Sequence, residues 1–176
     1  MAREAADKFN LERVLFVPAG HPPHKSDSTG ACYEDRYRMV ELACQPHPRF
    51  EPSRIEEGQE MSYTIVTVEK LRSLAKELYF LIGADAFAEI RTWYRWEELI
   101  QLTEFIVVTR PGHVYDCPPG ARVHRLDTVA LPISSSEIRL QLSRGKVPAE
   151  LPAAVAEYIV QKGLYRFPHK SANTAP

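Results

Sequence analysis

Three short runs of consecutive apolar residues place the strongest constraint on how this chain can fold. They cover residues 14–17 (Val-Leu-Phe-Val), 78–82 (Leu-Tyr-Phe-Leu-Ile) and 105–108 (Phe-Ile-Val-Val). A continuous apolar run of this length predicts a strand buried on both faces, whereas a strand with one solvated face would alternate apolar and polar residues. Strands of this kind occur in parallel sheets that helices cover. The chain is therefore predicted to be an α/β protein.

Apolar residues at helical spacing, and the turn residues between them, predict the other elements. We expect helices at residues 2–9, 35–44, 62–74, 134–144 and 151–161, and short strands at residues 50–55 and 123–126. Residues 1–166 are expected to form one domain, because a chain of 176 residues can bury a full core without disulfides. The polar segment 167–176 is expected to be a disordered tail.

Composition narrows the class of protein. The 22 Lys and Arg against 23 Asp and Glu give a net charge of −1, which argues against nucleic acid or an anionic membrane as the main partner. The three cysteines lack CxxC spacing, which predicts free thiols in a reducing cytoplasm and no structural zinc. No apolar run approaches the ~20 residues of a membrane span, and the first residues lack the layout of a secretory signal.

A serine cluster at the start of a predicted helix is the first candidate for a ligand site. The hydroxyls of Ser134, Ser135 and Ser136 and the first free amides of this helix could bind a phosphate, and Arg139 lies about one turn further on. The guanidinium of Arg139 could hold phosphate oxygens in a bidentate way. The alternative is an ordinary helix cap, in which Ser135 or Ser136 caps the helix and Glu137 bonds its first turn.

The loops after the three apolar runs supply further candidates, because ligands of open α/β sheets bind outside the carboxyl ends of the strands. His24 and Lys25 follow the first run and could contact a substrate phosphate, although a loop stiffened by prolines with a solvated lysine is the simpler reading. After the second run, Gly83 allows close approach of a ligand, and Asp85 could bind ribose hydroxyls, help order Mg²⁺, or cap a helix. Arg110 follows the third run.

Two more stretches carry residues suited to a flat, phosphorylated ligand. Tyr63 and Thr64 open a helix that also holds Thr67, so amides and hydroxyls there face a strand-to-helix junction. Trp93 and Tyr94 could stack on an aromatic ring, whereas Trp96 is expected to pack on the sheet. Such an aromatic cluster is more often part of a core.

Taken together, several stretches resemble the nucleotidylyltransferase superfamily. Residues 133–139 (Ile-Ser-Ser-Ser-Glu-Ile-Arg) are similar to its ISSTxxR element. Similarity to bacterial nicotinate-mononucleotide adenylyltransferases extends over almost the whole chain, at residues 14–25, 62–64, 81–85, 93–96 and 155–165. The resemblance implies a Rossmann-like, doubly wound parallel sheet. It also implies transfer of the adenylyl group of ATP to nicotinate mononucleotide, with Mg²⁺ screening the triphosphate.

The resemblance also implies roles for individual residues. Arg139 would be catalytic and would bind ATP together with Gly83, Asp85 and the three serines. The mononucleotide would be bound by the remaining candidates, namely His24, Lys25, Tyr63, Thr64, Thr67, Trp93, Tyr94 and Arg110. No residue is assigned as a metal ligand. The chain departs from the family at Val66, where the family's YTxDT element has an acidic residue.

A larger departure is the absence of the strand and the HxGH motif with which members of the family begin. None of the six histidines lies in such a motif, and residues 1–9 resemble the later part of the helix that it opens. The missing strand would be central, so its neighbours are expected to have unpaired backbone groups and open edges that favour self-association. Either the true start lies upstream of Met1, or the chain is a real truncation with little or no activity.

Two alternative functions follow from this departure. The chain could be a catalytically silent module that still binds nucleotides. It could also be another adenylyltransferase of the superfamily, such as the pantetheine-phosphate enzyme, although residues 62–64, 83–85 and 92–96 favour a pyridine nucleotide.

Overall fold

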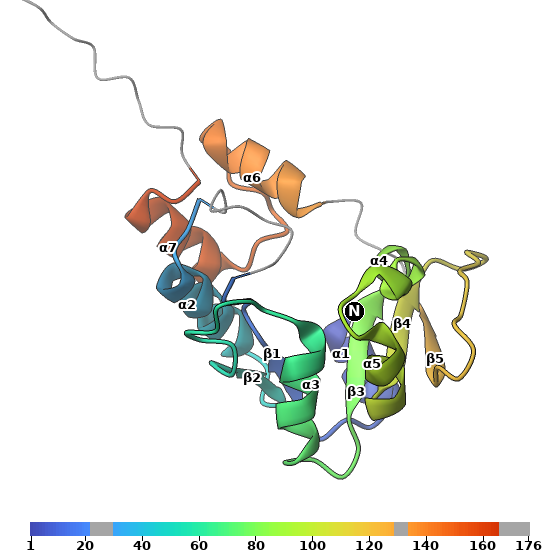
Figure 1. The fold of residues 1–176 in the computed structure, drawn as a ribbon. Coiled ribbons are helices and arrows are strands. Elements are labelled where there is room, and N and C mark those ends of the chain that lie inside the picture. Colours follow the sequence, from blue (N-terminus) through green and yellow to red (C-terminus); the bar gives the residue numbers. More distant parts are fainter. Residues whose placement is uncertain (22–29, 129–133, 166–176) are drawn as a thin grey trace, which may run out of the picture.

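The computed structural model describes residues 1–21, 30–128 and 134–165 (Figure 1). Its helices and strands follow in the order α1 (Ala2–Lys8), β1 (Val14–Phe16), α2 (Tyr33–Cys44), β2 (Phe50–Pro52), α3 (Thr64–Arg72), β3 (Tyr79–Gly83), α4 (Ala84–Ala88), the 3-10 turn η1 (Ile90–Thr92), α5 (Trp96–Leu102), β4 (Glu104–Thr109), β5 (Val123–Asp127), α6 (Ser135–Ser143) and α7 (Ala153–Lys162). Strand follows helix as the apolar pattern predicts, and the predicted α/β class is confirmed. The predicted tail at residues 167–176 lies outside the described residues.

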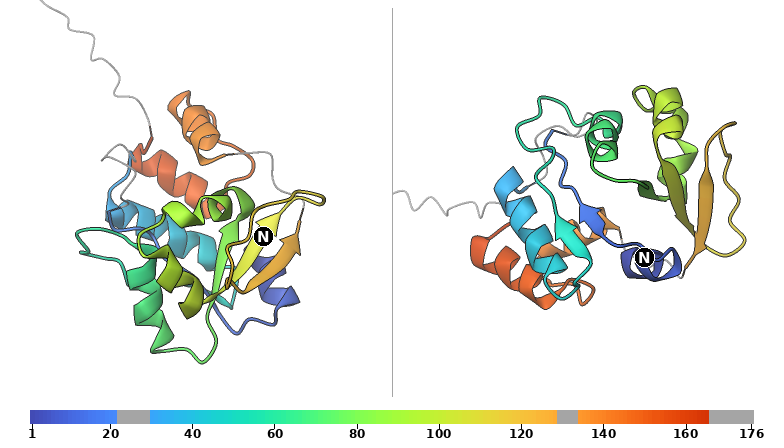
Figure 2. Two further views of the ribbon diagram at one scale, coloured as in Figure 1. Left: turned by 45° about the vertical axis from the view of Figure 1, so that its right-hand side comes forward. Right: turned by 90° about the horizontal axis from the view of Figure 1, so that it is seen from below.

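All strand pairs in the described residues are parallel, but the strands form two separate sheets. One contains β1 and β2, with Val14 opposite Phe50, and the other has the order β3-β4-β5. Figure 2 shows the two-stranded sheet apart from the three-stranded one, with α1 below and between them. No strand pair joins the two sheets within the described residues.

The division changes how deeply the strands are buried. β4 lies between β3 and β5, and Phe105 to Thr109 are buried. By contrast, β1 is only half-buried along its length, and in β3 only Ile82 is buried. The predicted burial is therefore confirmed for β4 and met only in part for β1 and β3, because each of these strands lies at the edge of a sheet. In β3 both faces still contact core clusters, through Phe80 on one side and Tyr79 and Leu81 on the other.

Backbone groups along the two edges follow the alternation of a parallel ladder. The amide of Val14 donates to the carbonyl of Arg49, just before β2, and the amide of Glu104 donates to the carbonyl of Leu78, just before β3. Backbone groups of every second residue point to the same neighbouring strand, so the amides and carbonyls of Phe80 and Ile82 also point toward β4. Leu15 in β1, and Tyr79 and Leu81 in β3, consequently point their amides and carbonyls away from their only sheet neighbour. Within the described residues these groups have no strand partner.

Helices cover both faces of the three-stranded sheet. The larger core cluster joins α3, α4 and α5 to β3 and β4, with Phe87 and Phe105 fully buried. On the opposite face α1 packs through Ala5 against Ile106 and Leu126. A third cluster packs α6 and α7 on α2 (Figure 1). None of the helices in these described segments is long and apolar enough to cross a membrane.

Candidate functional site

α6 begins with the predicted serine cluster, and its start is a complete capping box. Ser134 is the N-cap: its hydroxyl accepts from the amide of Glu137 at 3.1 Å, and the Glu137 carboxylate accepts from the Ser134 amide at 3.3 Å. The expectation that Ser135 or Ser136 caps the helix is therefore wrong, because the cap lies one residue earlier. Both hydroxyls are exposed, and the amides of Ser135 and Ser136 have no intrahelical partner.

Arg139 lies one turn beyond these serines. Its Nη2 is 3.4 Å from the Ser136 hydroxyl, a weak contact, and the other guanidinium donors have no hydrogen bond to the residues that the structure describes. Burial raises the pKa of the Tyr165 phenol, and the nearby charges of Arg139 and Arg36 oppose that shift. The Arg139 and Arg36 guanidinium groups, from α6 and α2, and the Asp35 carboxylate thus all lie near one half-buried phenol, so the charges around Tyr165 are mixed.

Gly83 and Asp85 lie where β3 passes into α4. Gly83 is the N-cap, with extended backbone, and a Cβ built on it would meet no atom within 4 Å. The alternative that Asp85 caps this helix is wrong, because Asp85 lies in its first turn. α4 ends at Ala88, and Ile90 begins the 3-10 turn η1. Asp85 is exposed beside open space, which is compatible with the predicted contact to ribose.

Of the predicted aromatic residues, Tyr94 is exposed and the others pack on the protein. The Tyr94 ring lies 4.4 Å from that of half-buried Tyr63, and 55% of Tyr94 is exposed, so a flat ligand can reach Tyr94. Trp93 instead packs on the core cluster, edge-to-face with Phe80 at 6.1 Å, and Trp96 packs on the same cluster. The expected packing of Trp96 is thus observed, and Trp93 shares it.

The start of α3 separates the two predicted threonines. Thr64 is the first helical residue and is half-buried, with an amide that has no intrahelical partner. Thr67 is 6% exposed, and its hydroxyl donates to the carboxyl of Glu56 at 2.6 Å. That hydroxyl therefore has a partner within the protein. Val66, which replaces the acidic residue of the family, packs against the core cluster.

The segment after β1 is held by residues that the sequence did not single out. The Arg36 guanidinium donates from Nη1 to the Ala19 carbonyl at 2.6 Å and from Nη2 to the Gly20 carbonyl at 3.3 Å. The amide of His21 donates to the Ser62 hydroxyl at 3.0 Å. One arginine in an amphipathic helix carries no motif, so these contacts became visible only in three dimensions.

The remaining candidates are less well defined. His24 and Lys25 lie outside the described residues. Arg110 is exposed just beyond β4, and its carbonyl accepts from Arg125 at 3.3 Å. In the part of the chain that is described, no three His, Cys, Asp or Glu side chains group closely enough to hold a metal ion.

The candidates thus form two groups within the described residues. One contains the start of α3, Tyr94 and the segment after β1, which direct contacts join. The other contains the start of α6 with Arg139. No described hydrogen bond, ion pair or ring contact joins Arg139 to Asp85 or to the Tyr63–Tyr94 pair. A ligand long enough to touch both groups would have to bridge them.

Comparisons with known proteins identify the family to which this chain is similar. A family model described as cytidylyltransferase-like matches residues 1–141. A protein of Solibacter usitatus named "probable nicotinate-nucleotide adenylyltransferase" is 54% identical over 167 residues, which cover 93% of this chain and 89% of that relative. One of the same name from Acidothermus cellulolyticus is 41% identical over 177 residues, which cover 94% and 85%.

A solved structure has the same fold. It is Plasmodium falciparum nicotinic acid mononucleotide adenylyltransferase complexed with NaAD, with a TM-score of 0.73 and 19% identity over 93% of this chain and 89% of that one. At this identity the likeness concerns the fold alone. It confirms the predicted nucleotidylyltransferase type of α/β fold.

Proposed function

This chain belongs to the nicotinate-nucleotide adenylyltransferase family, and from that membership we propose that it transfers the adenylyl group of ATP to nicotinate mononucleotide in NAD biosynthesis. The mononucleotide phosphate attacks the α-phosphate of ATP. A new phosphoanhydride bond forms, the bond to the β-phosphate breaks, and deamido-NAD and pyrophosphate are the products. We place the reaction in the cytoplasm.

The two groups of side chains suit the two substrates. The free amides and hydroxyls of Ser135 and Ser136, together with Arg139, are suited to the ATP phosphates. Gly83 and Asp85 are suited to the adenosine side. The exposed Tyr94, with half-buried Tyr63 beside it, offers an aromatic surface for the pyridine ring. The other predicted contacts of the mononucleotide stay predictions, namely His24, Lys25, Thr64, Thr67, Trp93 and Arg110.

Phosphoryl-type transfer asks a protein mainly for alignment and charge neutralisation. The amides at the start of α6 point their partial positive charge at a bound phosphate, and the Arg139 guanidinium can follow charge as it moves to the leaving pyrophosphate. Binding the pyridine ring at the α3 side fixes the attacking phosphate relative to ATP. The chain therefore needs no nucleophile of its own.

Mg²⁺ fits this site as a companion of ATP. Because the described residues build no cage of three ligands, the ion would be held mainly by the triphosphate, with Asp85 as the available carboxylate. When bound, Mg²⁺ neutralises charge on the phosphates.

The observation that carries the proposal is the 54% identity to a relative over 93% of this chain. It is tested by following NAD formation in a coupled assay with ATP and nicotinate mononucleotide. Arg139→Ala should lower turnover about 10²-fold, because a donor to the developing charge is lost. Arg144→Ala, at the other end of α6, is the matched control and should leave turnover unchanged. Unchanged turnover in Arg139→Ala would remove the catalytic role of this residue.

A second function, nucleotide binding without catalysis, is favoured by one observation: the chain contains no HxGH sequence. Calorimetry with each substrate, beside the coupled assay, separates the two functions. Binding of both substrates without turnover would identify the chain as a silent module.

The open edges of β1 and β3 could also pair two copies of the chain, which sedimentation would reveal.

A further inference from the structure

We infer that Arg36 is a positioning residue for the mononucleotide side of the site. Its guanidinium holds residues 19–21, which follow β1, against the segment that leads into α3. These two segments then act as one rigid surface. This inference rests on the proposed function and deepens it, because it names what holds one substrate subsite in place.

The contacts of Arg36 are directed at backbone rather than at an acidic partner. Nη1 and Nη2 donate to the successive carbonyls of Ala19 and Gly20, and a charged donor makes such bonds stronger than neutral ones. The Nε atom is buried and has no hydrogen-bond partner among the described residues. The two carbonyls are therefore the groups that the side chain is placed to hold.

The same backbone is held from its other side. A Cβ on Gly20 would lie 2.3 Å from the Glu56 carbonyl oxygen, so a larger residue would push the two segments apart. The amide of His21 donates to the Ser62 hydroxyl at 3.0 Å, and the amide of Ser62 donates to the His21 carbonyl at 2.9 Å. Residues 19–21 are thus clamped between α2 and the segment that leads into α3.

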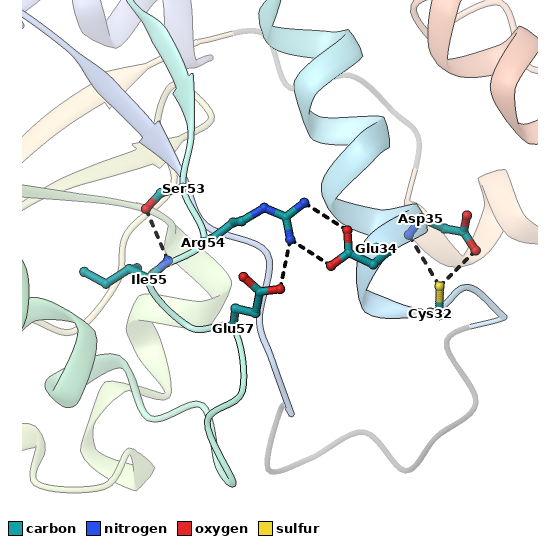
Figure 3. A network of polar contacts seen from close by, with 7 residues as sticks. All are labelled: Cys32, Glu34, Asp35, Ser53, Arg54, Ile55 and Glu57. Carbon is teal, nitrogen blue, oxygen red and sulfur yellow. Dashed lines mark hydrogen bonds and ion pairs between the residues drawn. The ribbon is translucent and has the colours of Figure 1, made fainter.

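α2 itself is fixed to that segment. Arg54 binds both carboxylate oxygens of Glu34, at 2.7 and 2.9 Å, and also reaches Glu57 at 2.9 Å (Figure 3). The Arg54 guanidinium lies 3.8 Å from the centre of the Tyr37 ring. Because Glu34 and Arg36 are on the same helix, the ion pairs of Arg54 help to keep the Arg36 guanidinium beside residues 19–20.

The clamp leads directly to the candidate ligand residues. Ser62 precedes Tyr63, whose ring lies 4.4 Å from that of exposed Tyr94 and is tilted by 36° to it. Freeing the clamp should therefore disturb the mononucleotide side. The ATP side should change less, because Gly83 and the start of α6 are held by other elements.

The test compares Arg36→Ala with Arg38→Ala in the full chain. Arg38 is on the same helix, and the one hydrogen bond of its guanidinium within the described residues goes to Glu41 at the surface. We expect Arg36→Ala to raise KM for nicotinate mononucleotide at least about tenfold, with KM for ATP changed less than about twofold, because displaced contacts weaken binding of the affected substrate. Arg38→Ala should match the wild type. Equal changes in both KM values, or none, would overturn the inference.

Two further variants keep the test decisive if Arg36→Ala folds poorly. Arg36→Lys retains a charge that can reach one carbonyl, and its KM should lie between those of the wild type and Arg36→Ala. Ser62→Ala removes the acceptor of the His21 amide and should raise the same KM. The double variant should then show less than the sum of the two effects, since both act through one clamp. Additive effects would contradict a shared clamp.

Hydrogen exchange separates failure of the inference from failure of the proposed function. The amides of His21 and Ser62 should exchange at least about tenfold faster in Arg36→Ala than in Arg38→Ala, whether or not the chain is active. Equal exchange rates would refute the clamp even in an active enzyme. An inactive wild type that binds no nicotinate mononucleotide would refute the proposed function, and the exchange rates would still decide whether Arg36 holds the backbone.

Discussion

Thr67→Val should destabilise the protein measurably, because it removes the donor from a buried hydrogen bond. The Thr67 hydroxyl and the Glu56 carboxyl are 2.6 Å apart, and the two residues are only 6% and 8% exposed. Valine has nearly the same shape but cannot donate, so the Glu56 carboxyl would stay buried with one bond fewer. Leaving a buried acceptor unsatisfied costs about 1–3 kcal/mol, and more when it is charged.

The expected loss can be followed by urea and thermal unfolding. A cost of about 2 kcal/mol corresponds to a fall in Tm of roughly 4–8 °C for a domain of this size. Thr67→Ser is the control, because it keeps the hydroxyl and loses only a methyl group, which is worth about 0.8 kcal/mol when buried. Thr67→Val should therefore lower the free energy of unfolding more than Thr67→Ser does.

The result also bears on the predicted contact between Thr67 and the mononucleotide. If the hydroxyl serves mainly Glu56, stability falls while KM changes little. A free energy of unfolding within about 0.5 kcal/mol of the wild type, as for a neutral surface substitution, would refute the reasoning from burial. A rise in KM without loss of stability would instead favour a ligand contact.

Two further predictions concern the three-stranded sheet. A hydrogen bond with His124, at 2.6 Å, lowers the pKa of Glu104. Since the pKa of Glu104 in the folded state lies below its unfolded value, the hydrogen bond stabilises the protein above about pH 4.5, and this stabilisation is lost as the pH falls through the folded pKa. Between pH 7 and pH 4 the free energy of unfolding in urea should therefore fall less in Glu104→Gln than in the wild type. Amide exchange along β3 should alternate, fast at Leu81 and slow at Phe80 and Ile82, because only the latter two amides face β4. Equal protection of all three would mean that both edges of β3 are paired in solution.

The sequence predicted most elements well where the local pattern decides them. The run at residues 105–108 lies in the buried strand β4. α7 begins after Pro152 and ends before Gly163, which adopts the left-handed conformation that ends a helix. The cap of α6 was misplaced by one residue, since three successive serines offer equivalent hydroxyls and only the backbone geometry chooses among them.

Burial and the site itself depended on contacts between distant segments. The run at residues 78–82 is as apolar as a central strand, yet its exposure is set by what lies beside β3, which no local pattern encodes. Thr67 likewise looks like any helical threonine until Glu56 is found beside it. Arg36 was missed for the same reason, because its partners are carbonyl groups, and a carbonyl has no signature in the sequence.

The division of the sheet has one more consequence for the site. Strand pairing does not hold the two sheets to each other in the described residues, so helix packing has to do so. α3 follows β2 and packs on α5 within the main core cluster, and Arg95 bonds Glu69 on α3 and Glu98 on α5, at 2.8 and 2.6 Å. Arg95 adopts φ +53, an uncommon conformation for a residue other than glycine, immediately after exposed Tyr94. The proposed reaction needs two bound substrates to be aligned accurately, so the contact between α3 and α5 would set the placement of the proposed pyridine subsite relative to the three-stranded sheet.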